Sequence, residues 1–294
     1  MADILITGAT GKTGVHATTT LLGRGHRVRA LAHRTDERSR RLAEAGAEIV
    51  TGDLLDLDTL AKATQGIQAV YLTYPIAPGL MEATANLLQA AEENRVGALV
   101  NMSQVPARRD AGSNASRQHW VAERMLDHFS GTVTHIRPTF FAEWLLHFRD
   151  EQTGDLRLPF GEGRHAPIPA EDQGRVIAAI LEDPTPHAGK IYPLYGPVEM
   201  NHHEIAEAVS TTLGYRVNYV PIDIEEFQAD LRRAGRGDHI IQHLSNVAID
   251  YRNGIFAGTN DLIGNLTGTE ALTVEAFVER NRQAFDSHPS RRHR

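Results

Sequence analysis

The stretch Thr7-Gly8-Ala9-Thr10-Gly11-Lys12-Thr13-Gly14 decides the fold class of this chain. It follows Ile4–Ile6, an apolar segment typical of a buried strand, and precedes Val15–Leu22, which is typical of a helix. Glycines at this spacing permit a tight turn, the close approach of a phosphate to backbone amides, and packing of the helix on the strand. The loop therefore predicts a dinucleotide-binding site, because backbone amides and the positive helix end hold a pyrophosphate. A glycine turn with only a structural role is the alternative.

The fragment Gly11-Lys12-Thr13 also resembles the end of the phosphate loop of nucleoside triphosphatases. That loop requires another glycine five residues before Gly11, and this chain has Ile6 there. The residue at this position excludes a triphosphatase loop. We therefore expect Lys12 to lie beside a dinucleotide, partly exposed to solvent.

Short apolar segments alternate with longer helix-like stretches through the first part of the chain. Because parallel strands need long crossover connections, this alternation predicts an α/β fold with a doubly wound parallel sheet, the Rossmann fold. The expected strands are Ile4–Ile6, Val28–Ala32, Glu48–Val50, Ala69–Thr73, Ala98–Met102 and Thr132–Arg137.

Glycine and proline become frequent from about Asp150 onward, which predicts a domain boundary near that residue. We expect a dinucleotide-binding Rossmann domain over residues 1–150 and a smaller C-terminal substrate or lid domain over residues 151–286. Residues 287–294 are rich in arginine and are expected to form a disordered basic tail. Helices are expected at Trp120–Phe129, Arg175–Leu181 and Glu204–Leu213.

The composition is that of an ordinary globular protein. Of the 294 residues, 41% are hydrophobic and 23% are charged, which argues against wholesale disorder and against a coiled-coil rod. The formal net charge of −7 argues against nucleic acid as a partner. The absence of cysteine excludes disulfides, thiolate nucleophiles and cysteine-based metal sites.

No apolar run approaches the length that spans a bilayer, and the first residues lack a basic signal-peptide region. We therefore expect no membrane partner and a cytoplasmic location. The sequence leaves the oligomeric state open, and a homodimer is compatible with it.

His33 and Arg34 follow the second expected strand, where nicotinamide dinucleotides are distinguished. A carboxylate there accepts a hydrogen bond from the adenosine ribose of NAD, whereas a cation pairs with the 2′-phosphate of NADP. Two acidic residues come slightly later, but three further arginines make the local charge positive, namely Arg38, Arg40 and Arg41. The sequence thus favours NADP (NADPH) over NAD. The alternative is that these residues are only the solvated start of a helix.

Further motifs are spread along the chain. They are Gly52-Asp53, His135-Ile136-Arg137-Pro138, Ala188–Tyr192 followed by Gly196-Pro197, and Leu266-Thr267-Gly268 followed by Leu272–Val278. With these motifs the chain resembles the NmrA-like branch of the atypical short-chain dehydrogenases/reductases over nearly its whole length. The resemblance implies a fold that binds NAD(P), in a branch that contains quinone-reductase-like enzymes and sensor proteins.

The resemblance also implies further cofactor contacts. Asp53 and Leu54 would border the adenine. The nicotinamide side would be lined and covered by residues at the ends of later strands, namely Thr73, Tyr74, Pro75, Ser103, Pro138 and Phe140.

The departure from the carbonyl-reducing short-chain dehydrogenases is the missing Tyr-x-x-x-Lys pair, which passes a proton to the substrate. The only lysines are Lys12, Lys62 and Lys190, and none has a tyrosine four residues before it. The aligned segment contains His119 and Glu123, as the resemblance implies for quinone-reductase-like members. Residues four apart share a helix face, so we expect a hydrogen bond in which Glu123 raises the pKa of His119 and lets it donate a proton. A simple helix-surface ion pair is the alternative.

Other residue groups are compatible with chemistry but have simpler interpretations. Asn201 and Glu204 fit a helix capping box better than a metal site. His239 and His243 are one helical turn apart, yet no third ligand is recognisable, so no metal is expected. Several aromatic residues fit either a substrate pocket or the core of the second domain, namely Trp144, Phe148, Tyr215, Tyr219 and Phe227.

The functional hypothesis is an NADP(H)-dependent oxidoreductase that transfers a hydride to a conjugated small-molecule acceptor, such as a quinone, imine, azo compound or dye. An acceptor that delocalises charge needs less protonation in the transition state, so the missing Tyr and Lys pair is tolerated. The alternative is a non-catalytic sensor whose relative affinity for NADP and NADPH regulates a partner protein.

Overall fold

A seven-stranded parallel sheet forms the centre of the computed structural model, which describes residues 1–150 and 152–287. The strands lie in the order β3-β2-β1-β4-β5-β6-β8, so the strand order reverses between β1 and β4. The doubly wound α/β fold expected from the sequence is confirmed. The strands are β1 (Asp3–Ile6), β2 (Arg27–Ala32), β3 (Glu48–Thr51), β4 (Ala69–Leu72), β5 (Ala98–Met102), β6 (Thr132–Pro138) and β8 (Lys190–Leu194).

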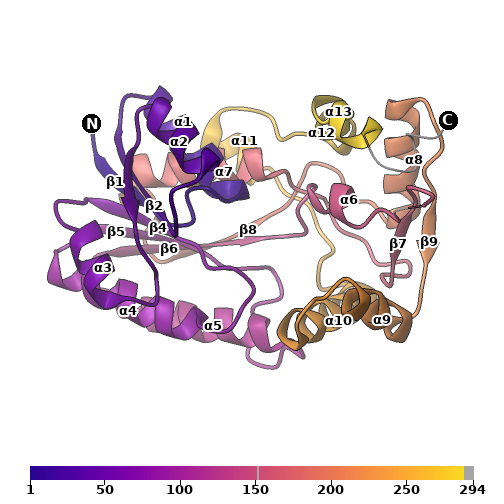
Figure 1. Cartoon of the computed structure of the whole chain (residues 1–294), viewed down its shortest axis with the longest axis horizontal. Coiled ribbons are helices and arrows are strands. Elements are labelled where there is room, and N and C mark those ends of the chain that lie inside the picture. Colours follow the sequence, from indigo (N-terminus) through magenta and orange to yellow (C-terminus); the bar gives the residue numbers. More distant parts are fainter. Residues whose placement is uncertain (151, 288–294) are drawn as a thin grey trace.

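Helices cover both faces of the sheet (Figure 1). One face carries α1 (Lys12–Gly23), α2 (Glu37–Glu44), α7 (Ala170–Glu182) and α11 (Leu262–Thr267), and the other carries α3 (Leu57–Ala63), α4 (Leu80–Glu93) and α5 (Asn114–Leu126). Successive strand residues point to opposite faces, so in β1 Ile4 and Ile6 join the core under α1 while Leu5 joins the core over α4. Burial on both faces explains why these strands read as continuous apolar runs.

The rest of the described chain forms a second layer of structure to the right of the sheet in Figure 1. It has its own hydrophobic core, which runs from Phe140 to Phe285. Its elements are α6 (Trp144–His147), the strand pair β7 (Leu156–Leu158) and β9 (Tyr219–Pro221), α8 (His202–Leu213), α9 (Ile224–Arg233), α10 (Asp238–Arg252), α12 (Val274–Arg280) and α13 (Arg282–Asp286). The short helix η1 (Thr185–His187) belongs to the sheet, where the Thr134 hydroxyl of β6 donates a hydrogen bond to the His187 carbonyl.

The chain returns to the sheet after residue 150. Strand β8 pairs in parallel with β6, and α7 packs closely on α1, where Gly174 lies so near His16 that a Cβ on the glycine would be 2.4 Å from the His16 Cβ. The boundary expected near residue 150 therefore does not separate the sheet from the second core. Of the expected tail, residues 288–294 lie outside the described residues.

The helix starts differ from the expected ones because capping residues precede the apolar stretch. Helix α5 begins at Asn114 rather than at Trp120, and the Ser113 hydroxyl accepts a hydrogen bond from the Ser116 amide at 3.2 Å. The capping box of Asn201 and Glu204 is confirmed at the start of α8. In the described part of the chain, no helix has the length and apolar character needed to cross a membrane.

Candidate active site

The glycine loop between β1 and α1 is shaped by close backbone contacts. Gly8 has a φ of +56°, a conformation that side chains disfavour, and its carbonyl accepts a hydrogen bond from the Gly11 amide at 2.8 Å. A Cβ on Gly14 would lie 2.3 Å from the Gly8 carbonyl oxygen and 2.8 Å from the Ala9 Cα. The third glycine thus lets α1 pack directly on the loop.

The start of α1 has the properties of an anion site. Its N-cap is Gly11, which supplies no side chain to the free amides, and its first turn contains no acidic residue within the described helix. The exposed amides and the helix dipole therefore attract a negative charge, and Lys12 adds a cation at the first helical position. These residues fit the diphosphate of a dinucleotide.

A cavity of about 750 Å³ opens at the carboxyl ends of the central strands, next to this loop. This is the edge where ligands bind in open parallel sheets, at the point where the strand order reverses. Twelve residues that the sequence proposed for cofactor or catalysis line it. They are Gly8, Thr10, Gly11, Lys12, Thr13, Thr73, Tyr74, Pro75, Ser103, His119, Pro138 and Phe140.

Four polar atoms among the lining residues are buried without a hydrogen-bond partner in the described chain. One is the His119 Nδ1 on α5, and the others, just after β5 and β6, are the Ser103 hydroxyl, the Gln104 amide nitrogen and the Thr139 hydroxyl. Buried polar groups are nearly always paired, so these atoms are suited to the polar edge of a bound ligand, such as the carboxamide of a nicotinamide.

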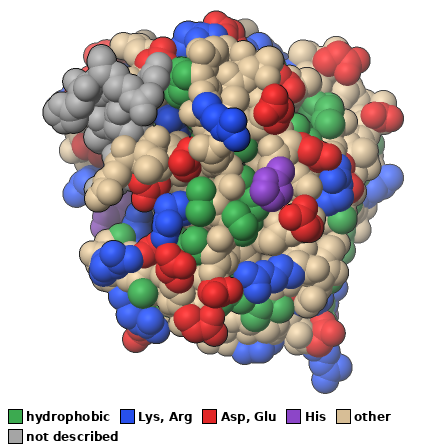
Figure 2. All heavy atoms as spheres, turned by 90° about the vertical axis from the view of Figure 1, so that its right-hand side faces the viewer, with side chains coloured by type: hydrophobic (Ala, Val, Ile, Leu, Met, Phe, Trp, Pro, Cys, Tyr) green, Lys and Arg blue, Asp and Glu red, His purple; other side chains and the backbone are tan. Residues whose placement is uncertain are grey.

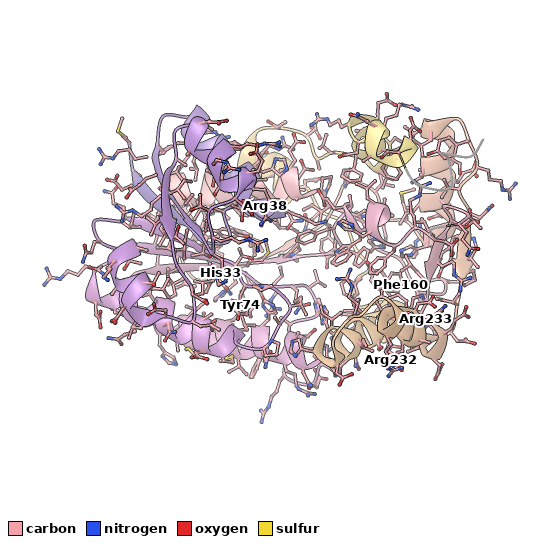
Figure 3. The ribbon with its side chains drawn as sticks, in the orientation of Figure 1. His33, Arg38, Tyr74, Phe160, Arg232 and Arg233 are labelled. Atoms are coloured by element: carbon pink, nitrogen blue, oxygen red, sulfur yellow. The ribbon has the colours of Figure 1, made fainter. Side chains whose placement is uncertain are left out.

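Four residues proposed for the adenosine end, His33, Arg34, Asp53 and Leu54, do not line this cavity. Arg34 is exposed, with its Nε 3.8 Å from an oxygen of Asp36, and the His33 ring lies 3.7 Å from Asp53. Arg38 from α2 does line the cavity. Figure 3 shows Arg38, His33 and Tyr74 at the same edge of the sheet. In the sequence analysis, Arg38 counted only as one of several positive charges after the second strand. Its position at the cavity follows from the start of α2 at Glu37.

The other half of the cavity is apolar, and most of it was missed by sequence reasoning. Phe140, the expected cover of the nicotinamide side, stacks on Trp144 with ring centroids 5.8 Å apart. Of the aromatic residues considered for a pocket, only Trp144 lines this cavity. The remaining apolar lining comes from distant segments, namely Ile76, Met102, Phe141, Ile240, Leu244, Val247 and Phe256. A planar apolar molecule fits such walls.

Lys12 connects the glycine loop to this apolar half. Its ammonium lies 2.6 Å from the Nε2 of His147 and 5.6 Å from the centre of the Trp144 ring. Partial burial lowers the pKa of Lys12, and the charge of Glu143 opposes that shift. The lysine is held by residues of the second layer, so the loop and the aromatic wall are fixed relative to each other.

The expected hydrogen bond between His119 and Glu123 is wrong. Both side chains are buried on α5, but the two carboxylate oxygens of Glu123 accept hydrogen bonds from Arg137 of β6, and Glu123 does not line the cavity. Burial lowers the pKa of His119 from 6.5 to about 3, opposite to the expected rise. His119 therefore faces the cavity as a neutral imidazole, and it has no excess proton to give at neutral pH.

The pair of Glu123 and Arg137 predicts a structural effect. Replacing Glu123 with glutamine leaves the half-buried Arg137 guanidinium without its counter-charge, so we expect the free energy of unfolding to fall by about 3 kcal/mol. Urea denaturation measures this change. Unchanged stability together with lost turnover would instead return Glu123 to the catalytic machinery.

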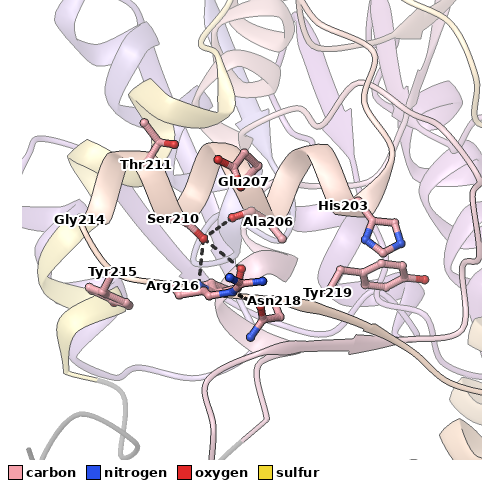
Figure 4. A pocket seen from close by; sticks show the side chains of 11 residues that line it. His203, Ala206, Glu207, Ser210, Thr211, Gly214, Tyr215, Arg216, Asn218 and Tyr219 are labelled. Carbon is pink, nitrogen blue, oxygen red and sulfur yellow. Dashed lines mark hydrogen bonds between the residues drawn. The ribbon is translucent and has the colours of Figure 1, made fainter.

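A second hollow, of about 610 Å³, lies between α8 and the segment that leads to β9. Figure 4 shows Ser210 among its lining residues, where the hydroxyl bonds to the carbonyls of Ala206 at 2.7 Å and Val217 at 3.0 Å. The lining includes Tyr215 and Tyr219, but no residue proposed for cofactor or catalysis. Acidic and basic side chains are interspersed on the face of the molecule that carries α8 (Figure 2).

The histidines considered as metal ligands have other surroundings. His243 is bonded through its Nδ1 to the Ser113 hydroxyl at 2.8 Å, and it lines the large cavity. Over residues 1–150 and 152–287, no group of three or more His, Cys, Asp or Glu side chains is arranged to hold a metal ion.

Comparison with known proteins adds to this description. The NmrA-like family is matched over residues 2–253. The chain is 27% identical over 286 residues to the NAD(P)H azoreductase of Xenophilus azovorans, which covers 96% of this chain and 99% of the relative.

Two solved structures show a similar fold. One is the NADPH-dependent quinone oxidoreductase of Escherichia coli complexed with NADPH, with a TM-score of 0.83 and 22% identity over 94% of this chain and 99% of the other. The second is NmrA, a negative transcriptional regulator, in complex with NAD, with a TM-score of 0.79 and 16% identity over 98% of this chain and 95% of the other.

Proposed function

The chain belongs to the NmrA-like family, and from this premise we propose that it is an NADPH-dependent reductase that transfers a hydride to a conjugated acceptor, such as a quinone, an azo compound, an imine or a dye. One observation carries the proposal. A single cavity is lined by the glycine loop, by aromatic side chains and by residues with unpaired polar atoms. The name of the azoreductase relative supports the same type of reaction.

When it is bound, the reduced nicotinamide supplies the hydride. The residues of this chain bind and orient it. The first turn of α1 and Lys12 would hold the diphosphate, and the unpaired Ser103 hydroxyl would bond the nicotinamide carboxamide. The aromatic wall of Phe140 and Trp144 stacks a planar acceptor and excludes water, which brings the two reactants together in a fixed orientation.

A sensor remains the second candidate, since the sequence has no Tyr-x-x-x-Lys pair and the NmrA regulator has a similar fold. The two candidates differ in what they need beyond the coenzyme. A sensor requires selective binding of one redox state, whereas a reductase also requires room for an acceptor. The apolar half of the cavity favours the reductase.

Turnover distinguishes these functions directly. The purified protein is mixed with NADPH and a panel of a naphthoquinone, an azo dye, a cyclic imine and a triphenylmethane dye, while the nicotinamide absorbance is followed. We expect oxidation of NADPH that depends on at least one acceptor. Tight, redox-selective binding of NADP without turnover of any acceptor supports the sensor instead.

Arg38 is the residue that we expect to select NADPH over NADH. Its Nη2 lies 2.7 Å from Asp36, and a 2′-phosphate is a stronger, doubly charged partner for the same guanidinium. Arg38→Gln should weaken NADPH binding about tenfold while leaving NADH nearly unchanged, as measured by calorimetry. Arg40→Gln is the matched control, because Arg40 lies on the same helix and outside the cavity. Equal losses for both coenzymes would remove Arg38 from this role.

A further inference from the structure

His243 is, with His119, one of two buried imidazoles that line the cavity. It lies on α10, its side chain is largely buried, and its Nδ1 is 2.8 Å from the Ser113 hydroxyl. Burial lowers the pKa of His119, and His243 adds to that shift because charges on both rings would repel each other.

The partner of His243 determines which nitrogen carries the hydrogen. Ser113 is completely buried, and its oxygen already accepts a hydrogen bond from the Ser116 amide at the start of α5. Its hydroxyl hydrogen then has His243 Nδ1 as its acceptor within the described residues. To accept this hydrogen bond from Ser113, the Nδ1 of His243 must have a free lone pair. The neutral imidazole therefore carries its own hydrogen on Nε2.

The neutral ring of His119 also carries its hydrogen on Nε2, but for a different reason. Its Nδ1 is buried without a partner in the described chain. An unpaired lone pair costs less than an unpaired N–H, so the hydrogen of the neutral ring belongs on Nε2. Burial lowers the pKa of His119 to about 3 and that of His243 to about 4, so both rings stay neutral near pH 7.

Helix α10 is bonded on both sides of His243 to the segment before α5 and to the first residue of α5. Arg108 donates two hydrogen bonds to the buried Asp250, at 3.1 and 2.6 Å. Gln242 accepts from the Asn114 amide at 3.0 Å and donates to the Gly112 carbonyl at 2.9 Å. These contacts lie on both sides of His243 in the helix, so its ring is held in a fixed position relative to α5.

We propose that His243 and His119 together present two N–H donors to the oxygen or nitrogen of an uncharged conjugated acceptor, and thereby select quinones, enones and azo compounds over cationic dyes. The proposal rests on the proposed reductase function and narrows its substrate class. A cationic triphenylmethane dye accepts hydride at a carbon that has no lone pair, so the two donors give it no advantage.

The reaction balances without a proton from either histidine. A hydride adds to one end of the conjugated system, one π bond breaks, and its electron pair moves to the oxygen or nitrogen at the other end. The two N–H groups stabilise that developing negative charge, and the atom then takes a proton from water. NADPH is oxidised to NADP, and the acceptor gains two electrons and two hydrogens.

Turnover of His243 variants tests the selection. His243→Leu has a similar volume and no donor, so we expect kcat/KM for the naphthoquinone and the azo dye to fall about 30-fold. The value for the triphenylmethane dye should change less than about threefold, and so should the Kd for NADPH. His243→Gln keeps an N–H donor and should restore most of the quinone activity. Equal losses for all acceptors, or no loss for any, overturn the proposal.

Binding of ligands in the absence of NADPH, where no hydride donor is present, tests it independently of turnover. Tetralone carries a conjugated carbonyl, and tetralin has the same ring system without it. We expect His243→Leu to weaken tetralone binding about tenfold and to leave tetralin binding unchanged, as measured by calorimetry. An equal effect on both ligands overturns the role of His243, whether or not the wild-type protein oxidises NADPH. A wild-type protein that oxidises NADPH with none of the offered acceptors contradicts the reductase function itself.

Discussion

Gly14→Ala is expected to abolish measurable coenzyme binding and to lower the free energy of unfolding by about 2 kcal/mol. The added Cβ would lie 2.3 Å from the Gly8 carbonyl oxygen and 2.8 Å from the Ala9 Cα, and both atoms belong to the backbone. Neither atom can rotate away as a side chain does. Helix α1 must therefore shift away from the loop, which moves the amides of its first turn from the diphosphate position. Calorimetric titration with NADPH and urea denaturation measure the two effects.

Gly23→Ala is the matched control for this variant. Gly23 is the last residue of the same helix, and in the described chain a Cβ added to it would meet no heavy atom within 4 Å. The exchange should stabilise the protein by about 0.5 kcal/mol and leave the Kd for NADPH unchanged, because alanine is the better helix former. Retention of full coenzyme affinity by Gly14→Ala would contradict the assigned role of the loop.

Five of the six strands that the sequence predicted are mostly buried between two layers of helices, whereas β3 lies at the edge of the sheet and is only partly buried. In β1 and β4, for example, Ile6 and Tyr71 are completely buried, so the apolar run is continuous and easily recognised. Strand β8 was not predicted. It lies at the edge of the sheet, where Ile191 is 39% exposed and Pro193 interrupts the pattern, so local sequence carries a weaker signal.

The part of the cavity wall that we assign to the coenzyme could be expected from the sequence, because its residues follow strands that are neighbours in a doubly wound sheet. The loop at Gly8 after β1, Thr73 after β4 and Ser103 after β5 converge at one edge of the sheet by topology alone. The acceptor half was not predictable. Leu244 and Val247 repeat at ordinary helical spacing on α10, and only the packing of α10 against the segment before α5 turns this face into a cavity wall.

The spacing of His119 and Glu123 illustrates a limit of local patterns. Both residues are buried, as their shared position on the helix implies. They do not bond to each other, however, because Arg137 of the following strand β6 donates to the Glu123 carboxylate, whereas His119 lines the cavity. A guanidinium offers two parallel donors to a carboxylate, which a neutral imidazole does not match.

Lowering the pH from 6 to 5 is expected to reduce the stability of the protein by about 4 kcal/mol, through four buried histidines. Burial lowers the pKa of His119 and His202 to about 3, that of His243 to about 4, and that of His165 well below 6.5. Between the lowered pKa of the folded state and the ordinary pKa of the unfolded state, a histidine binds a proton in the unfolded chain and not in the folded chain. The stability is therefore fully present above pH 6.5, and each histidine removes roughly 1 kcal/mol of it for every pH unit below about 6.

His165 and His202 do not line the cavity, so replacing them tests the pH dependence of stability without changing the candidate site. Their rings lie 5.1 Å apart in an aromatic cluster with Phe160, and neither nitrogen of either ring has a hydrogen-bond partner in the described chain. The double variant His165→Phe/His202→Phe keeps the ring shapes and removes two of the four protons, so urea denaturation between pH 6 and 5 should show about half the loss of the wild type. Replacing the exposed His128 with phenylalanine should leave the loss unchanged. An undiminished slope in the double variant would mean that carboxyl groups, rather than buried imidazoles, carry the acid sensitivity.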